Sequence, residues 1–202
     1  SIEGDAISND TKLALALLDC QRQLNATNVF SFHSTNKRAD VFSKVAHRVL
    51  GVAASETGTP RWLVDRVHGK MNATKRRAVL SQIDDAAGPT LITNARVLTT
   101  GVDVPAVDVV MFADPKQSEI EIRQVMARAA RVAPDKECGY VLVPVGVDED
   151  GPLEVLREVV QFCIENDKEW REAFNAWMKS VAHSGREPTA EGLPRELREF
   201  VG

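Results

Sequence analysis

Short apolar segments rich in β-formers alternate along this chain with longer segments of helical periodicity, and this alternation restricts the fold more than any other feature. Short apolar runs of this kind are typical of strands buried on both faces of a parallel sheet. The segments between them repeat apolar side chains every three or four residues, as helices do. The pattern predicts an α/β fold built from right-handed β-α-β units, with helices on both faces of a parallel sheet. The predicted strands span residues 28–33, 63–67, 91–93, 107–112 and 139–145.

Polar residues and glycines suggest where the helices begin and end. The segment 51–60 (GVAASETGTP) reads as a loop, and 146–152 (GVDEDGP) reads as a boundary. We therefore expect one α/β domain over residues 1–147 and a helical extension with a tail over 148–202. The expected helix starts are Asn9 or Asp10, Thr35 or Asn36, Asn72, and Ser118.

Composition limits the classes of function. The 202 residues carry a net charge of −4, so a nucleic-acid contact must be a local site rather than a basic coat. Cys20, Cys138 and Cys163 are isolated and lack metal-ligand spacing, which predicts reduced cysteines in a cytoplasmic protein and no metal site. No apolar run approaches the roughly 20 residues of a membrane helix, and no secretory pattern opens the chain. The abrupt start, SIEGDAISND, predicts a piece of a longer protein.

The most informative stretch is 90–134. It contains TNARVLTTGVDVP, an apolar run that ends in a Gly-Val-Asp turn, and then Gln124, Arg128 and Arg131 at spacings of four and three. On a helix those spacings put the three side chains on one face. Two arginines on one face suit a polyphosphate, because guanidinium groups bind phosphate oxygens in pairs and stay charged.

Several segments, in this order, resemble the second RecA-like lobe of superfamily-two helicases and translocases. FSFHS (30–34) resembles motif IV, and VHGKMNATKRR (67–77) resembles a His-Gly segment with a downstream arginine. TNARVLTTGVDVP resembles motif V, and QVMARAAR resembles motif VI. The phrasing, including FADP and APDKECGYVLVPV, is most similar to restriction-modification helicases. The resemblance covers about residues 28–146 and implies a RecA-like, three-layer α/β lobe.

The resemblance implies a role for each residue of the 90–134 stretch. ATP lies between two lobes, and Arg131 is expected to be the arginine finger, a residue worth about 10³–10⁵ in rate. Arg128 would hold the same phosphate or position the finger, and Gln124 would couple the helix to the nucleotide. Gly101 would allow close approach of the backbone, and Asp103 would hold the motif V turn or the ribose.

Nucleic acid, with DNA favoured over RNA, is expected at strand ends and helix N-termini, where backbone-type donors bind phosphates without reading sequence. His33 has a capping or packing role as its alternative, and the Arg76 region could be a solvated helix face. The candidates are His33, Ser34, His68, Gly69, Arg76, Asn94, Thr99 and Thr100.

The sequence departs from the family pattern at two positions and lacks half of the family's site. Ala127 stands where motif VI has glycine, and Thr100 where restriction-type relatives often have an acidic residue. No GxxxxGK[ST] occurs, and the DED at 148–150 lies in a polar Asp/Gly/Pro turn rather than at the end of an apolar strand. We expect ATP and Mg²⁺ to bind only together with an N-terminal RecA-like lobe, so the chain alone should not hydrolyse ATP. Nuclease or methyltransferase domains are possible further partners.

Two alternatives stay open. A non-catalytic module could keep this fold and bind nucleic acid or protein, and Ala127 favours it. An unrelated nucleotide-binding enzyme such as a dehydrogenase is the other, but no GxGxxG follows the first strand.

Overall fold

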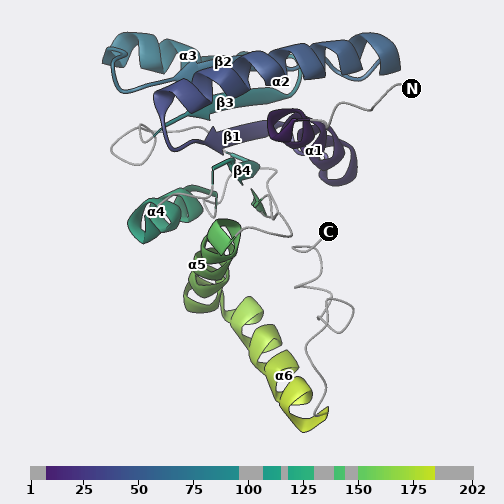
Figure 1. Cartoon of the computed structure of the whole chain (residues 1–202), viewed down its shortest axis with the longest axis vertical. Coiled ribbons are helices and arrows are strands. Elements are labelled where there is room, and N and C mark those ends of the chain that lie inside the picture. The colour runs from purple at the N-terminus through teal and green to yellow at the C-terminus, as the bar shows by residue number, and fades with distance from the viewer. Residues whose placement is uncertain (1–7, 96–106, 115–117, 130–138, 144–149, 185–202) are drawn as a thin grey trace, which may run out of the picture.

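A five-stranded parallel sheet forms the centre of the molecule (Figure 1). The computed structural model describes residues 8–95, 107–114, 118–129, 139–143 and 150–184. The strand order is β2-β3-β1-β4-β5, and every pairing between neighbours is parallel. The predicted α/β class and parallel sheet are therefore confirmed. The strands are β1 (Asn28–Phe32), β2 (Leu63–Val67), β3 (Thr90–Asn94), β4 (Val109–Phe112) and β5 (Tyr140–Leu142).

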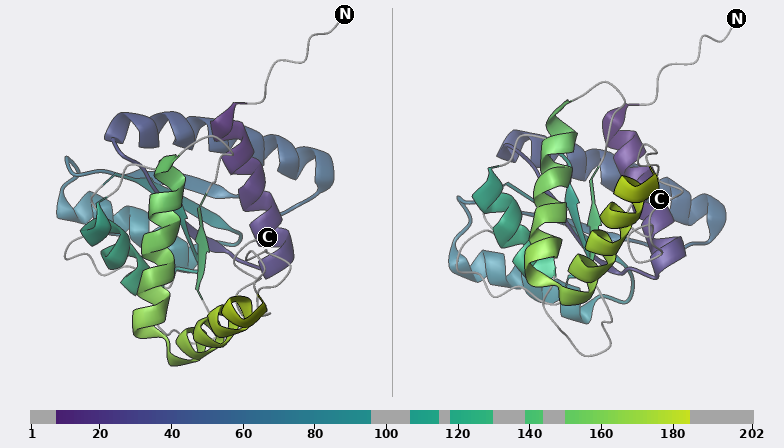
Figure 2. Two further views of the ribbon diagram at one scale, coloured as in Figure 1. Left: turned by 60° about the horizontal axis from the view of Figure 1, so that its bottom comes forward. Right: turned by 90° about the horizontal axis from the view of Figure 1, so that it is seen from below.

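Helices cover both faces of the sheet and make the fold three-layered (Figures 1 and 2). α1 and α2 pack on one face, whereas α3, α4 and α5 pack on the other. α6 packs against α5 and extends away from the sheet (Figure 1). The helices are α1 (Asn9–Leu24), α2 (Asn36–Thr57), α3 (Ala73–Asp85), α4 (Glu119–Ala129), α5 (Asp150–Asn166) and α6 (Lys168–Ser184). None of the described helices is long and apolar enough to cross a membrane.

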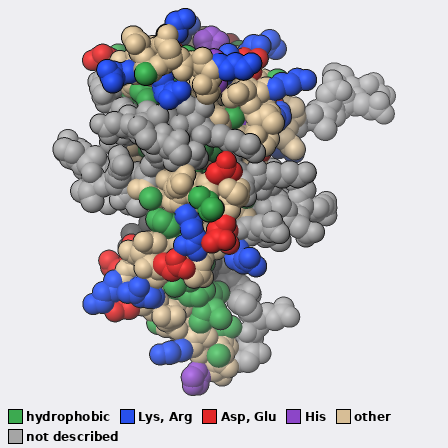
Figure 3. Space-filling model, turned by 90° about the vertical axis from the view of Figure 1, so that its left-hand side faces the viewer, with side chains coloured by type: hydrophobic (Ala, Val, Ile, Leu, Met, Phe, Trp, Pro, Cys, Tyr) green, Lys and Arg blue, Asp and Glu red, His purple; other side chains and the backbone are tan. Residues whose placement is uncertain are grey.

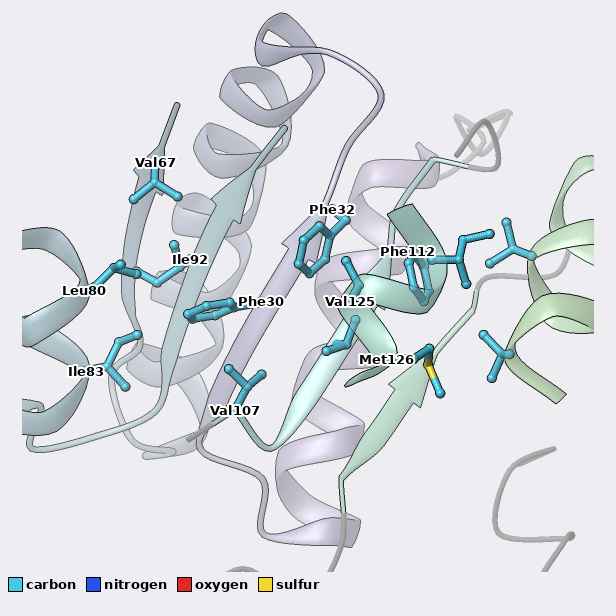
Figure 4. Close-up of a cluster of buried hydrophobic side chains, with 14 of the residues drawn as sticks. Phe30, Phe32, Val67, Leu80, Ile83, Ile92, Val107, Phe112, Val125 and Met126 are labelled. Carbon is cyan, nitrogen blue, oxygen red and sulfur yellow. The ribbon is translucent and has the colours of Figure 1, made fainter. Parts of the chain in front are cut away.

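Side chains that alternate along each strand build two separate cores. In β1, Val29 faces α1 and α2, and Phe30 faces the opposite layer. The second layer contains Phe32, Phe112 and Val125, whose side chains lie together in Figure 4. Because both faces of the central strands are buried, these strands read as continuous apolar runs in the sequence.

The predicted helix starts are largely correct because polar side chains cap the first turns. The Thr35 hydroxyl accepts a hydrogen bond from the Arg38 amide at 3.1 Å, and Asn72 Oδ1 accepts one from Lys75 at 2.8 Å. α1 differs slightly, since its cap is Ser8 rather than Asn9 or Asp10.

The predicted loop at 51–60 is wrong for most of its length, because α2 continues to Thr57. Two alanines favour the helix there, and the Thr57 hydroxyl donates to the Ala53 carbonyl at 2.7 Å. The helix ends at Gly58, whose φ of 65° suits glycine.

The helical extension contributes to the core of the sheet. α5 begins inside the predicted boundary, at Asp150, and buries Val155 and Val159 against the α3 and α4 layer. The division of the chain into 1–147 and 148–202 stays a prediction.

Candidate functional site at the carboxyl edge of the sheet

The carboxyl ends of the central strands lie at one level of the sheet. Phe32 is in register with Asn94 on one side and with Phe112 on the other. Val67 is in register with Asn94 as well. The residues that follow these strands therefore share one edge, as expected for ligand sites of parallel sheets. Figure 3 views the molecule from the side toward which β1 points in Figure 1.

Asp114, which follows β4, binds the start of α2. Its Oδ2 accepts hydrogen bonds from the Ser34 amide at 2.9 Å and from the Ser34 hydroxyl at 2.7 Å. Its Oδ1 lies 3.4 Å from Arg38 Nε. Arg38 also pairs with Asp10 of α1, with Nη2 2.8 Å from Oδ1. A chain of charges thus joins α1, α2 and the end of β4, and both donors of Ser34 are already in use.

The electrostatics of this network favour its ionised form. Burial raises the pKa of Asp114, but the two hydrogen bonds from Ser34, together with the charge of Arg38, lower it more, so the net pKa is below the usual value. The side-chain hydrogen bond to Asp10 raises the pKa of Arg38. The carboxylates therefore act as internal counter-ions for Arg38.

His33 lies in the interior rather than at the surface. Its side chain is 2% exposed, its ring packs 5.0 Å from that of Phe42, and its Nε2 lies 3.1 Å from the Ser31 hydroxyl. Burial lowers the pKa of His33 to about 4, although Asp114 raises it, so the ring is neutral near pH 7. In this conformation the ring packs in the core, the alternative role foreseen for it.

Asn94 is also buried and holds two strands together. The Asn94 side-chain Nδ2 donates to the Ser31 backbone carbonyl at 3.0 Å, and the Asn94 backbone carbonyl accepts from the His33 amide at 2.9 Å. Among the described residues, Asn94 Oδ1 and His33 Nδ1 have no hydrogen-bond partner. They are two of seven such buried atoms in the part of the chain that the structure describes, so they do not by themselves mark a site.

The segment after β2 forms a compact turn against α3. The Met71 amide donates to the His68 carbonyl at 3.0 Å, and Arg76 Nη2 donates to the Met71 carbonyl at 3.2 Å. Gly69 is exposed, while His68 and Arg76 are half-buried. The structure therefore brings His68, Gly69 and Arg76 together, and Arg76 closes the turn instead of extending into solvent.

The nucleotide-binding predictions fall on α4 and beyond it. Gln124 and Ala127 are exposed on this helix, and Arg128 lies one turn after Gln124. The side chain of Arg128 is outside the part of the protein that the structure describes. Five further predicted residues lie wholly outside the described ranges: Thr99, Thr100, Gly101, Asp103 and Arg131.

Ionic contacts fix α4 on α5. Arg123 Nη1 lies 2.6 Å from Glu165 Oε2, and its Nε lies 3.1 Å from Glu119 Oε1. Glu158 stands 3.8 Å from the same Nε. The start of α4 is a capping box, because the Ser118 hydroxyl accepts from the Glu121 amide and Glu121 Oε2 accepts from the Ser118 amide.

Sequence reasoning missed the residues that organise this edge, namely Asp10, Arg38, Asp114 and Arg123. A signal existed for Asp114, since an acidic residue directly after a buried strand is placed to meet a neighbouring helix N-terminus. No local pattern marks Asp10 and Arg38, which are 28 positions apart.

The family model described as "Helicase conserved C-terminal domain" matches residues 12–133, more than half of the chain and all strands but the last. The chain belongs to this family. It is the second RecA-like lobe of a superfamily-two helicase, as the motifs indicated.

Individual relatives are distant. The ATP-dependent RNA helicase DBP7 of Gibberella zeae is 25% identical over 124 residues, which are 61% of this chain and 16% of that protein. The DNA-bound ATP-dependent Type ISP restriction-modification enzyme LlaBIII has a similar fold, with a TM-score of 0.66 and 22% identity over 84% of this chain and 12% of that one. The C-terminal domain of the DEAD-box protein Dbp5 matches with a TM-score of 0.51 and 16% identity, covering 77% of this chain and 79% of the domain. The helicase lobe thus spans only a small part of the first two proteins.

Proposed function

We propose that this helicase lobe completes the ATP site of a nucleic-acid motor whose other lobe carries the phosphate-binding loop. The observation that carries the proposal is α4, a helix fixed at one flank of the sheet with Gln124 exposed and Arg128 one turn later. Arg131 is the proposed finger, which offsets the charge that develops on the γ-phosphoryl oxygens. Arg128 grips the same phosphate, and Gly101 and Asp103 shape the motif V turn beside it.

The proposed nucleotide site needs a partner lobe. No GxxxxGK[ST] loop occurs in the sequence, and the DED at 148–150 lies in a polar segment unlike the acidic motif that holds Mg²⁺. The groups that hold Mg²⁺ and activate water therefore come from the other lobe, which supplies the metal chemistry when ATP binds. This chain contributes the positive charge of Arg128 and Arg131, and it orients the phosphate that they bind.

We further propose that the carboxyl edge contacts the nucleic-acid backbone. The turn of His68, Gly69 and Arg76 offers exposed backbone close to a helix N-terminus, a place that favours phosphates. Asn94, together with the buried His33, orders this edge from inside, while Thr99 and Thr100 belong to the same proposed contact. DNA is favoured because LlaBIII, one of the similar structures, is DNA-bound.

A direct test joins this chain to its partner lobe. The longer protein, with both lobes, should hydrolyse ATP faster in the presence of duplex DNA, and the 202-residue chain alone should show no turnover. Strong DNA-stimulated hydrolysis by the isolated chain would contradict the proposal. RNA, tested in parallel, decides between the two nucleic acids.

A non-catalytic binding module is the second candidate, and it rests on Ala127. This residue stands where the family motif has glycine, and it is exposed on α4, where its methyl group adds bulk to the helix surface. Under this alternative Ala127→Gly would leave ATP turnover of the longer protein absent, whereas a motor lobe would keep or increase its turnover.

A further inference from the structure

Positive charge is concentrated in one continuous part of this acidic chain. Residues 37–77 contain ten lysines and arginines but only three aspartates and glutamates. The chain as a whole carries a net charge of −4, so the remaining segments are strongly acidic. A local excess of this size creates a positive surface, provided that the side chains face solvent together.

The fold brings this segment to one margin of the sheet. The segment forms α2, the edge strand β2 and the start of α3. The two helices lie on opposite faces of the sheet at that edge. In Figure 3, several Lys and Arg side chains lie in the upper part of the molecule, over these elements, and others lie on the helices below. We define the basic flank as Lys37, Lys44 and Arg48 of α2 together with Lys70, Lys75 and Arg77 at the start of α3. All six are exposed.

The α2 part of the basic flank is a stripe on the outer side of the helix. Lys37, Lys44 and Arg48 follow each other at spacings of seven and four, which return to the same side of a helix. The opposite side buries Phe42 and Leu50 in the core. The stripe therefore faces solvent and spans about 16 Å, at 1.5 Å per residue.

Few of these cations are neutralised. Lys44 pairs with Asp40 at 2.7 Å, and Asp40 also accepts from Arg66, so one carboxylate serves two cations. Within the described ranges, the other five members of the basic flank form no ion pair with an acidic side chain. In the described part of the chain, these five cations therefore lack the acidic counter-ions that Arg38 has in Asp10 and Asp114.

The charges match a regular polyanion. Duplex DNA carries a phosphate about every 3.4 Å along each strand, so the α2 stripe faces about five phosphates of one strand. Lys and Arg side chains without nearby aromatic or acidic partners bind the backbone without reading bases. The stripe begins at Lys37, three residues after Ser34, so it continues from the edge proposed for the nucleic acid.

We propose that the basic flank is a second nucleic-acid contact, which binds the backbone of duplex extending past the carboxyl edge of the sheet. This inference rests on the proposed function, because it takes the bound ligand to be the nucleic acid of the motor. It adds the outer side of α2 to the proposed contact and extends the His68–Arg76 turn by the neighbouring cations at the start of α3.

The test compares two lengths of duplex DNA and a matched pair of double variants of the 202-residue chain. The double variant Lys44→Glu with Arg48→Glu reverses the charge at two of the three positions of the α2 stripe. As its control, Lys12→Glu with Arg22→Glu makes the same charge change at exposed positions of α1. We expect the α2 variant to bind a long duplex of about 40 base pairs at least about tenfold more weakly at about 50 mM salt. Its salt dependence, log Kd against log salt, should fall by about 2, as expected for two lost phosphate contacts.

Three controls complete the experiment. A short duplex of about 12 base pairs should lose less affinity than the long one, because it reaches less of the stripe. Lys44→Gln with Arg48→Gln should reduce binding in the same direction by a smaller factor, and thermal unfolding should show that all variants remain folded. Poly-glutamate should bind more weakly than the duplex.

Several results would overturn the inference. They are equal losses in the α1 and α2 variants, equal losses for short and long duplex, tighter binding of poly-glutamate, or no duplex binding by the wild-type chain at low salt. The proposed function is judged separately by ATP turnover of the longer protein. If the longer protein hydrolyses ATP but its α2 variant binds long duplex as tightly as wild type does, only the inference about the basic flank is contradicted.

Discussion

Asp114 Oδ2 accepts both hydrogen-bond donors of Ser34, the amide at 2.9 Å and the hydroxyl at 2.7 Å. The carboxylate thereby occupies the place beside the α2 N-terminus that a phosphate would otherwise favour. Ser34 was predicted to contact nucleic acid, and its donors are committed to Asp114 in this structure. A phosphate at this position would have to displace the carboxylate, which makes Asp114 the residue to test first.

Asp114→Asn should lower the free energy of unfolding by about 1–3 kcal/mol, because it weakens two hydrogen bonds to a charged acceptor. The lowered pKa of Asp114 gives the sign of the pH effect. Its contribution is present above the unfolded pKa of the carboxyl and is lost as the pH falls through the folded value. Urea unfolding at pH 7 measures the change, and Asp19→Asn on α1 is the control expected to have little effect. An unchanged midpoint for Asp114→Asn would contradict the role assigned to this carboxylate.

His33 should make the fold sensitive to mild acid. The folded pKa of about 4 lies below the ordinary value of 6.5, so between these two pH values the unfolded chain binds a proton that the folded chain does not. Stability should therefore decrease as the pH falls from about 6.5 to about 4, by up to about 3 kcal/mol. Asp114 and Asp10 favour the proton and Arg38 opposes it, but burial dominates.

Thermal unfolding of wild type and His33→Gln from pH 7.5 to pH 4.5 measures this effect, in buffers chosen to span the window. The variant should show a flatter dependence of Tm on pH. Parallel curves for the two proteins would show that His33 does not titrate as described.

Arg123 should hold α4 against α5. Arg123→Ala removes contacts to Glu119 and Glu165, so Tm should fall, and Glu165→Gln should lower it as well. The double variant should lose less than the two single losses together, because both changes break one ion pair. Arg157→Ala, at an 82% exposed side chain, is the control. Strict additivity of the two losses would contradict the pairing.

Phe112 should be among the most costly side chains to truncate. It is 1% exposed, lies in the core beneath α4 and α5, and packs beside Phe32 with ring centroids 6.1 Å apart. Phe112→Ala should cost about 3–5 kcal/mol of unfolding free energy. Val52→Ala, at a residue 57% exposed on α2, should change it little. Chemical unfolding of both variants checks the contrast, and similar losses would refute the core assignment.

The fold class could be predicted from the sequence because strands buried on both faces of a sheet are continuous apolar runs. Each central strand is a short apolar run, and a capping residue precedes each of the first helices. The end of α2 was missed, since Ser55 and Thr57 look like loop residues until their hydroxyls are seen bonding back to the helix. Local side-chain hydrogen bonds of this kind decide where such a helix ends.

The site was predicted less completely, for physical reasons. Helical spacing was enough to put Gln124 and Arg128 on one helix, and the motif order was enough for the family. The engagement of Ser34 depends on Asp114, which is 80 positions away from Ser34, and the buried ring of His33 packs against Phe42 of α2. Long-range pairs of this kind leave no periodic trace in the sequence, so only the structure shows them.

The central claim is that the motif VI arginines act on the transition state of ATP hydrolysis. The decisive measurement is single-turnover hydrolysis together with ATP affinity for Arg131→Ala in the longer protein that contains both lobes, with Arg157→Ala as control. We predict a fall in the hydrolysis rate of about 10³-fold or more with little change in ATP affinity. A rate that stays near wild type, or a loss of affinity as large as the loss of rate, would contradict the claim.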